Sequence, residues 1–290
     1  MGGLGNQMFQ YAFGKNTSIK YGFELKFETY LYKKDRFKRF LKNIIKIIIA
    51  IFAKKGIIKK IEEIRQNKRQ YDLKYFELDD KIKKIKKSHL PIIEERTEFC
   101  FDPELAKDKD NLSYLGYFNN EKYFSEISDI IRNDFKLKKR YTDLLPQELI
   151  KKINESVSVS VHIRRGDYIN TKGINQYHGT CDIAYYQRAT NFLKDKLLNP
   201  IFFIFSDDIN WCKNNLQLES ETIFISGLKN YEDLTLMSKC KHNIIANSTF
   251  SWWGAWLNPF PNKIVIAPKK WLNNPEIDTS TIIPDNWIKL

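Results

Sequence analysis

The second half of the chain alternates between short apolar runs and longer segments with helical periodicity. Residues 157–163 place valine and isoleucine at every second position, which predicts a strand, and residues 201–205 are wholly apolar and predict a fully buried one. Asp182 precedes a helical pattern that extends to about Leu197, and it is suited to cap that helix. Further strands are expected at 222–225, 243–246 and 264–267, and further helices at 231–241 and 248–257. This alternation predicts an α/β fold with a parallel sheet and helices on both faces.

The first half shows the same signals less regularly. Residues 2–7 are expected to form a tight glycine-rich turn, Met8 to about Tyr21 a helix and residues 23–27 a strand. These elements are the later part of a β-turn-α-β unit, so we expect a strand before Gly2. Because the sequence begins there, we expect a truncation or a misassigned start codon.

Residues 120–135 carry apolar side chains at helical spacing and predict an amphipathic helix. Residues 136–156 are polar and rich in lysine, and they contain Pro146. We therefore expect the connection between two domains there, with residues 1–150 forming an N-terminal domain and residues 151–290 a C-terminal domain.

Charge distinguishes one segment from the rest of the chain. Residues 33–87 hold 20 basic and 7 acidic residues, which accounts for the whole formal net charge of +13. Within 33–70, apolar residues at helical spacing alternate with lysine and arginine, so an inserted basic helical region is expected over about 33–88. Two interpretations stay open: a helix that lies on an anionic membrane surface, or a core-facing helix with a solvated basic face.

Composition restricts the classes of protein that the chain can belong to. The 290 residues with 42% hydrophobic content are enough for a folded core or two domains. The four cysteines are far apart and the four histidines are scattered, so free thiols and no metal site are expected. No signal peptide and no apolar run of membrane-spanning length is visible, so we expect a cytoplasmic protein, with residues 33–70 as its candidate contact to the inner face of a membrane.

Polar side chains follow three of the predicted strands. His162 to Tyr168 come after the first strand of the second half, Ser206-Asp207-Asp208 after the next, and Asn247 to Ser251 after the strand at 243–246. Ligands of parallel α/β sheets bind at the carboxyl ends of the strands. These three sets are therefore the candidate site.

Two adjacent arginines, Arg164 and Arg165, suit a diphosphate, because guanidinium groups offer paired donors to phosphate oxygens. The alternative is a structural salt bridge, for example between Arg165 and Asp167, and one arginine can serve each purpose. Asp207-Asp208 resembles a metal-binding acidic pair only superficially, so no metal is expected.

Ser248 and Thr249 open a predicted helix, either as an N-cap or as an anion site that uses the unpaired N–H groups of the helix end. Trp252 and Trp253 are expected in the core rather than as a substrate platform. The glycine loop at 2–5 lacks the Gly-Lys-Ser/Thr of a nucleotide P-loop. Its expected role is to let the backbone, Asn6 and Gln7 approach a ligand.

Taken together, these segments resemble glycosyltransferase family 11, the α1,2-fucosyltransferases, in its bacterial branch. The resemblance covers roughly residues 1–30 and 90–290. It rests on Gly2 to Ala12, Gly116 to Phe124, Val161 to Tyr168, His178-Gly179, Phe205 to Asp208, Tyr231 to Leu234 and Asn247 to Leu257. The His-x-Arg-Arg-x-Asp-Tyr and Asn-Ser-Thr-Phe-Ser-Trp-Trp-Gly-Ala-Trp strings are its most specific parts.

The resemblance implies a fold and a reaction. The fold would be two Rossmann-like domains that face each other across a cleft, of GT-B type, with GDP-fucose in the C-terminal domain and the acceptor beside the N-terminal one. The reaction would be an inverting, metal-independent transfer of L-fucose to the 2-hydroxyl of a terminal galactoside, in the synthesis of a surface glycan such as O-antigen. Neither a cofactor nor a metal would be needed.

The resemblance also implies roles for individual residues. Arg164 would grip the β-phosphate and Arg165 would support it, and Asp167 would be a candidate base or a partner of Arg165. The donor would further be held by His162 near the guanosine, Asp233 on the guanine N–H groups, Ser248, Thr249 and Phe250 at the diphosphate, and Asn6 with Gly3 and Gly5 from the other domain.

Three alternatives remain from the sequence. The first is a fucosyltransferase with the same donor and another acceptor or linkage. The second is a basic nucleic-acid-binding protein, which the confinement of the charge to one segment with few interleaved aromatics disfavours. The third is a catalytically inactive relative, because loss of the first strand would loosen the glycine loop.

Overall fold

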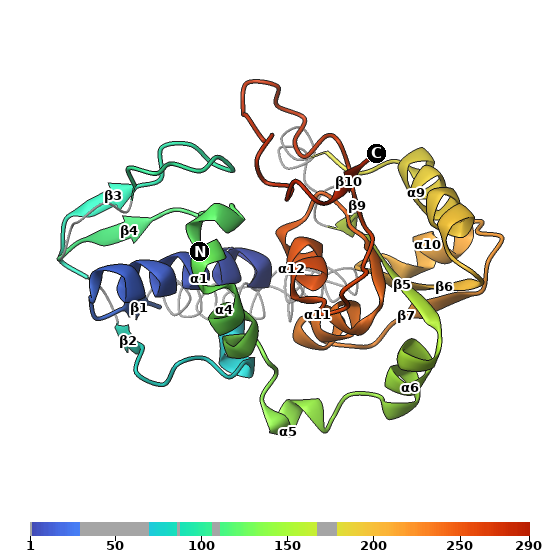
Figure 1. The fold of residues 1–290 in the computed structure, drawn as a ribbon, viewed down its shortest axis with the longest axis horizontal. Helices are drawn as coiled ribbons and strands as arrows, with labels where there is room; N and C mark the ends of the chain where they lie inside the picture. Colours follow the sequence, from blue (N-terminus) through green and yellow to red (C-terminus); the bar gives the residue numbers. More distant parts are fainter. Residues whose placement is uncertain (1, 30–69, 86–87, 106–110, 167–178) are drawn as a thin grey trace, which may run out of the picture.

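A six-stranded parallel sheet forms the centre of the second half of the molecule (Figure 1). The computed structural model describes residues 2–29, 70–85, 88–105, 111–166 and 179–290. The strand order is β10-β9-β8-β5-β6-β7, and all pairings are parallel. The strands are β5 (Val157–Ile163), β6 (Pro200–Ser206), β7 (Thr222–Ile225), β8 (His242–Ile244), β9 (Val265–Ala267) and β10 (Ile288–Lys289).

Alternation along these strands sorts their side chains between two helical layers. Val159, Val161 and Phe202 pack with α9 (Ile183–Lys196) and α10 (Ile209–Asn215). Phe203 and Phe205 belong to the other core, with α11 (Asn230–Lys239), α12 (Thr249–Leu257) and α6 (Gln147–Glu155). The predicted parallel sheet with helices on both faces is confirmed, and each strand and helix expected between residues 157 and 267 is present within a few residues.

The first half is built on α1 (Leu4–Tyr21), an 18-residue helix that ends at Gly22 in the left-handed conformation. Around it, the described strands form two parallel pairs. These are β1 (Lys26–Glu28) with β2 (Lys83–Ile85), and β3 (Ile92–Glu94) with β4 (Ser113–Leu115). The predicted α/β class is thus present in two halves that face each other, with α1 of one half beside α12 of the other (Figure 1).

Two local expectations were wrong. The helix begins at Leu4 rather than after a turn at 2–7, because Gly3 is its N-cap. The helix expected at 120–135 is broken into two 3₁₀ turns and the short α4 (Ser128–Asp134), because the backbone leaves helical geometry at Phe124 and again at Ile127. The turns are η2 (Glu121–Tyr123) and η3 (Ser125–Ile127). The polar connection expected at 136–156 contains α5 (Lys139–Thr142) and α6, and the division into two domains at residue 150 stays a prediction.

Most of the basic insertion expected at about 33–88, including the whole candidate membrane segment up to residue 69, lies outside the described residues. Its described end contains the 3₁₀ turn η1 (Asp72–Tyr75) and β2. Within the described parts of the chain, no helix is long and apolar enough to cross a bilayer.

Candidate active site

The site lies where the order of strands in the large sheet reverses. From β5 the chain continues through β6 and β7 to one edge, and then returns to β8 on the other side of β5 before going on to β9 and β10. Loops that leave β5 and β8 therefore diverge and open a crevice at their carboxyl ends, which is the usual ligand position in such sheets. Arg164 follows β5 and Ser248 follows β8, so the predicted polar sets meet at this switch point.

Both arginines are held by the acidic pair that follows β6. Arg164 Nη1 lies 3.0 Å from Asp207 Oδ2, and the Arg165 backbone N–H donates to Asp207 Oδ1 at 2.9 Å. The Arg165 guanidinium stacks on the Trp211 ring, 3.5 Å from its centroid, and its Nε is 3.8 Å from Asp208 Oδ2. The Asp208 side chain in turn accepts from the backbone N–H of Trp211 and so caps the N-terminus of α10. The carboxylates of Asp207 and Asp208 therefore orient the guanidinium groups of the two arginines.

His162 lies in β5, two residues before Arg164, and its buried imidazole is neutral. Its side chain is 4% exposed, and burial together with the neighbouring Arg164 lowers its pKa to about 3. Its ring lies 5.5 Å from that of Phe250, so it bridges the β5 and β8 sides of the switch point. His162 Nδ1 and Arg165 Nε are two buried side-chain atoms of the described chain that have no hydrogen-bond partner. Such groups usually find a partner, so two of them at one strand edge favour a ligand site.

The helices α1 and α12 begin next to each other, with their first turns in contact. Ser248 caps α12 as predicted, because its hydroxyl accepts from the Phe250 N–H. The first turn of α1 packs directly on it: a Cβ at Gly5 would lie 2.5 Å from the Thr249 carbonyl carbon. Thr249 Oγ1 donates to Asn6 Oδ1 at 2.7 Å. Neither helix has an acidic residue in its first turn, so the positive ends of both helix dipoles are left without a local carboxylate.

The remaining residues that the sequence singled out lie in a helix turn, in the core or outside the described residues. Asp233 lies in the first turn of α11, where burial and the adjacent Glu232 raise its pKa to about 7. Asp167 lies outside the described residues, so the Arg165–Asp167 bridge stays a prediction. Trp252 and Trp253 are fully buried, which confirms the core interpretation. The Gln7 side-chain amide is engaged within the protein: it donates to the carbonyls of Gly2 and Gln70 and accepts from the Asp72 backbone N–H, which anchors the segment before η1.

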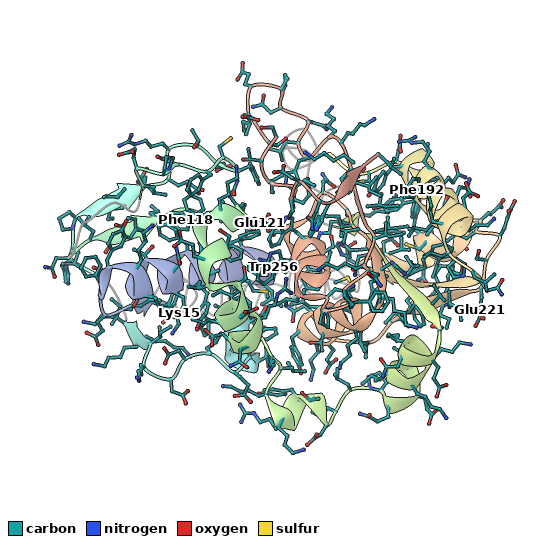
Figure 2. All side chains as sticks on the ribbon, in the orientation of Figure 1. Lys15, Phe118, Glu121, Phe192, Glu221 and Trp256 are labelled. Carbon is teal, nitrogen blue, oxygen red and sulfur yellow. The ribbon has the colours of Figure 1, made fainter. Side chains whose placement is uncertain are left out.

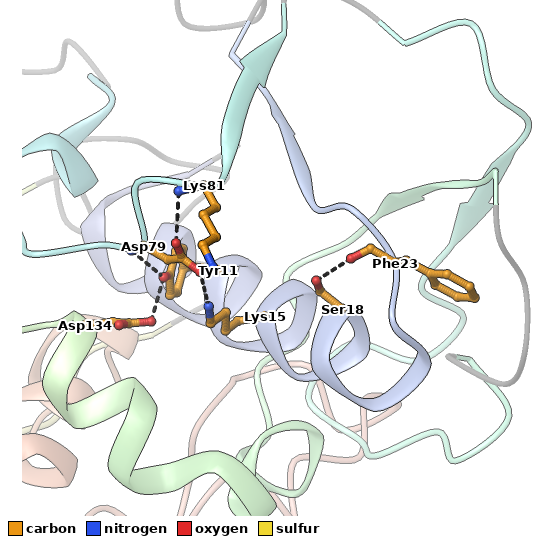
Figure 3. Close-up of polar contacts among 7 residues, drawn as sticks. All are labelled: Tyr11, Lys15, Ser18, Phe23, Asp79, Lys81 and Asp134. Atoms are coloured by element: carbon orange, nitrogen blue, oxygen red, sulfur yellow. Dashed lines mark hydrogen bonds and ion pairs between the residues drawn. The ribbon is translucent and has the colours of Figure 1, made fainter.

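A buried polar group in the N-terminal half was not predicted (Figure 3). The Tyr11 hydroxyl donates to Asp134 Oδ2 at 2.6 Å and accepts from the Asp79 N–H, and Lys15 pairs with Asp79. Burial raises the pKa of Tyr11 well above its ordinary value. Tyr11 and Asp79 also line a cavity of about 260 Å³ in this half. The sequence offers no signal for this group, because its members are 123 positions apart at the extremes.

Metal ligation has no support from the described residues. No group of three or more histidine, cysteine, aspartate or glutamate side chains there is arranged to hold an ion. The four cysteines form no disulfide, as expected, with Cys212 and Cys240 buried and Cys100 and Cys181 partly exposed.

Comparison with known proteins gives the chain its class. Residues 1–290 match the family described as Glycosyl transferase family 11. The chain is 35% identical to an alpha-1,2-colitosyltransferase of Escherichia coli, over all of this chain and 96% of the relative. It is 33% identical to the O-antigen biosynthesis glycosyltransferase WbnK of Escherichia coli, over all of this chain and 98% of the relative. A galactoside alpha-(1,2)-fucosyltransferase 1 of Bos taurus is 27% identical over half of this chain and 43% of the relative.

Among solved structures, the NodZ alpha-1,6-fucosyltransferase soaked with GDP-fucose aligns at a TM-score of 0.36 and 15% identity, over 53% of this chain and 54% of that one. POFUT1 in complex with GDP aligns at 0.37 and 14%, over 54% of each chain. These structural similarities are partial, whereas the family match spans the whole sequence, as do the alignments with the two Escherichia coli proteins. The chain therefore belongs to glycosyl transferase family 11 and is a glycosyltransferase.

Proposed function

We propose that this protein transfers L-fucose from GDP-fucose to the 2-hydroxyl of a terminal galactoside, with inversion and without a metal. The observation that carries the proposal is the convergence at the switch point of two helix N-termini and an oriented arginine pair. Helix N-termini and guanidinium groups are the usual protein partners of phosphate oxygens. A leaving diphosphate bound there would have its developing charge stabilised by groups already in place.

Each residue then has a role. Arg164 would bind the β-phosphate and Arg165 would support it, with Asp207 and Trp211 fixing their directions. The α12 N-terminus, through Ser248, Thr249 and Phe250, would bind the diphosphate, and Asn6 with Gly3 would approach it from α1. His162 would lie near the guanosine, and Asp233 would accept from the guanine N–H groups. Gly5 would act indirectly, by letting α1 approach α12.

Metal independence follows from the same chemistry. Other glycosyltransferases use a divalent cation to neutralise the diphosphate, and here two guanidinium groups and two helix dipoles would supply that positive potential. Asp207 and Asp208 are engaged by the arginines and by α10, so they are poorly placed to bind an ion. Asp167 stays the candidate base, and binding of residues 33–70 to the inner face of an anionic membrane stays a proposal.

A second donor has a specific observation in its favour. The relative at 35% identity is described as a colitosyltransferase, and colitose differs from fucose by lack of the 3-hydroxyl. The same diphosphate site would serve either sugar nucleotide.

The experiment is release of GDP from GDP-fucose, with and without lactose, in excess EDTA. Lactose-dependent release supports the donor, the galactoside acceptor and metal independence, and NMR of the product then identifies the linkage and anomer. Release that occurs only with GDP-colitose would replace fucose by colitose. Release that requires added Mg²⁺ would contradict metal independence.

A further inference from the structure

The C-terminal end of α12, opposite its proposed diphosphate end, is bound by two cations. The last carbonyl groups of a helix have no partner within the helix and need donors from elsewhere. Lys263 Nζ donates to the carbonyls of Ala255 and Asn258, each at 2.8 Å. Arg132 Nη1 donates to the carbonyl of Trp256. Both cations also lie at the negative end of the helix dipole, where positive charge is favourable.

Arg132 reaches this helix from the other half of the molecule. It lies on α4, and its guanidinium stacks over the Trp256 ring at 4.0 Å from the centroid. The Trp256 indole N–H donates to Glu121 Oε2 at 3.2 Å, and Glu121 belongs to η2 of the same N-terminal half. Figure 2 labels Glu121 and Trp256 close together, between the two halves. The Arg132 side chain is therefore held between a ring and a carbonyl, with little freedom to move.

The opposite end of α12 is fastened to the same half. Asn6 accepts from the Thr249 hydroxyl, and the Trp253 indole N–H donates to the Gly5 carbonyl at 3.0 Å. The middle of the helix is fixed as well, since a Cβ at Gly254 would lie 3.1 Å from Met237 Cβ on α11. The position of this nine-residue helix, and with it that of Ser248 and Thr249, is therefore set jointly by the contacts along its length, of which those at the Trp256 end are one part.

We propose that Arg132 is a positioning residue for the donor diphosphate, acting through α12 from the acceptor-side half. It does not touch the donor. It sets the axial and rotational position of the helix whose first N–H groups bind the phosphates. This inference rests on the proposed function, because it presumes that a nucleoside diphosphate binds at Ser248 and Thr249.

The test is GDP affinity of the full-length protein, measured by calorimetry for Arg132→Met and for Arg140→Met. Arg140 is the matched control, because its guanidinium also stacks on a ring, that of Tyr141, but it lies at the surface of α5. We expect a GDP Kd at least fivefold higher for Arg132→Met and unchanged for Arg140→Met. We also expect partial recovery in Arg132→Lys, which keeps a donor for the Trp256 carbonyl. The donor KM should rise, and kcat should fall as well, because the displaced N–H groups of α12 would also stabilise the leaving diphosphate.

Melting temperatures separate positioning from simple destabilisation. If Arg132→Met melts earlier but binds GDP as wild type does, the residue is structural only and the inference fails while the proposed function stands. If Arg132→Met does not fold, the same comparison is made with Arg132→Lys, for which an unchanged Kd and KM overturns the inference. Wild-type protein that does not bind GDP removes the proposed function itself.

Discussion

The Thr249 hydroxyl donates a 2.7 Å hydrogen bond to the side-chain oxygen of Asn6, a residue 243 positions earlier in the chain. The two residues belong to the first turns of α12 and α1, so this bond joins the two helix ends that converge at the candidate diphosphate site. It is a direct polar link between the halves at the point where the proposed chemistry takes place.

We expect the pair to act as a unit in donor binding. Asn6→Ala and Thr249→Val should each raise the donor KM, and the double variant should be less impaired than the sum of the two, with a coupling of about 0.5–3 kcal/mol. A double-mutant cycle on kcat/KM measures this. Strict additivity would show that the hydrogen bond does not contribute to the site.

Gly5→Ala should be strongly destabilising, because the added methyl would lie 2.5–2.6 Å from the backbone carbonyl atoms of Thr249. Overpacking against backbone costs about 1–3 kcal/mol or more. Urea unfolding measures the change. Gly14→Ala is the control on the same helix, since its methyl would meet only the flexible end of Leu25, and it should cost little. Equal stability of the two variants would contradict the observed helix contact.

Arg164→Ala should abolish transfer while leaving the fold intact, with a loss in kcat of roughly 10²–10³-fold or more, typical of removing a group that stabilises developing charge. Arg188→Ala, on the exposed face of α9, should retain full activity. Initial rates at saturating GDP-fucose measure kcat for both variants, and circular dichroism checks that each is folded. Near wild-type turnover in Arg164→Ala would remove the central role of this residue.

Binding of GDP-fucose should strengthen as pH rises through about 7. Burial and Glu232 raise the pKa of Asp233 to about 7, so its carboxyl is largely protonated at pH 6 and ionised at pH 8. An ionised carboxylate is the better acceptor for guanine N–H groups, and affinity falls by at most about tenfold per pH unit below the pKa. Calorimetry with GDP-fucose checks this, since its diphosphate does not titrate near pH 7. The dependence should disappear in Asp233→Asn and persist in the exposed control Asp129→Asn; a dependence retained by Asp233→Asn would exclude this residue.

Acid should destabilise the protein partly through His162. Its pKa is about 3 in the folded protein, because burial and Arg164 disfavour the cation, against an ordinary value of 6.5. The unfolded chain therefore binds a proton that the folded chain does not, and stability is lost as pH falls from about 6.5 toward 3. Urea unfolding between pH 7 and 4.5 should show a smaller loss for His162→Gln than for wild type. An equal loss of unfolding free energy with falling pH in wild type and His162→Gln would show that the imidazole is not buried as a neutral group.

The alternating apolar residues at 157–163 and the wholly apolar run at 201–205 by themselves predicted two strands, because the period of burial follows the period of the backbone. The succession of strands and helices along the second half then predicted the parallel sheet and its helical layers. For the same reason the three polar sets could be predicted to meet, since the ends of adjacent parallel strands share one edge. The Ser248 cap was also local and was predicted correctly.

Only the tertiary structure decided which of those polar groups bind one another. Asp207 pairs with Arg164, Arg165 stacks on Trp211, and Arg132 bonds the end of α12, and no spacing in the sequence encodes these contacts. The approach of Gly5 to Thr249 depends on packing between residues that are more than 240 positions apart in the chain. Local periodicity determines which face of a helix or strand is buried. Which other element packs against that face depends on the free energy of the whole folded chain.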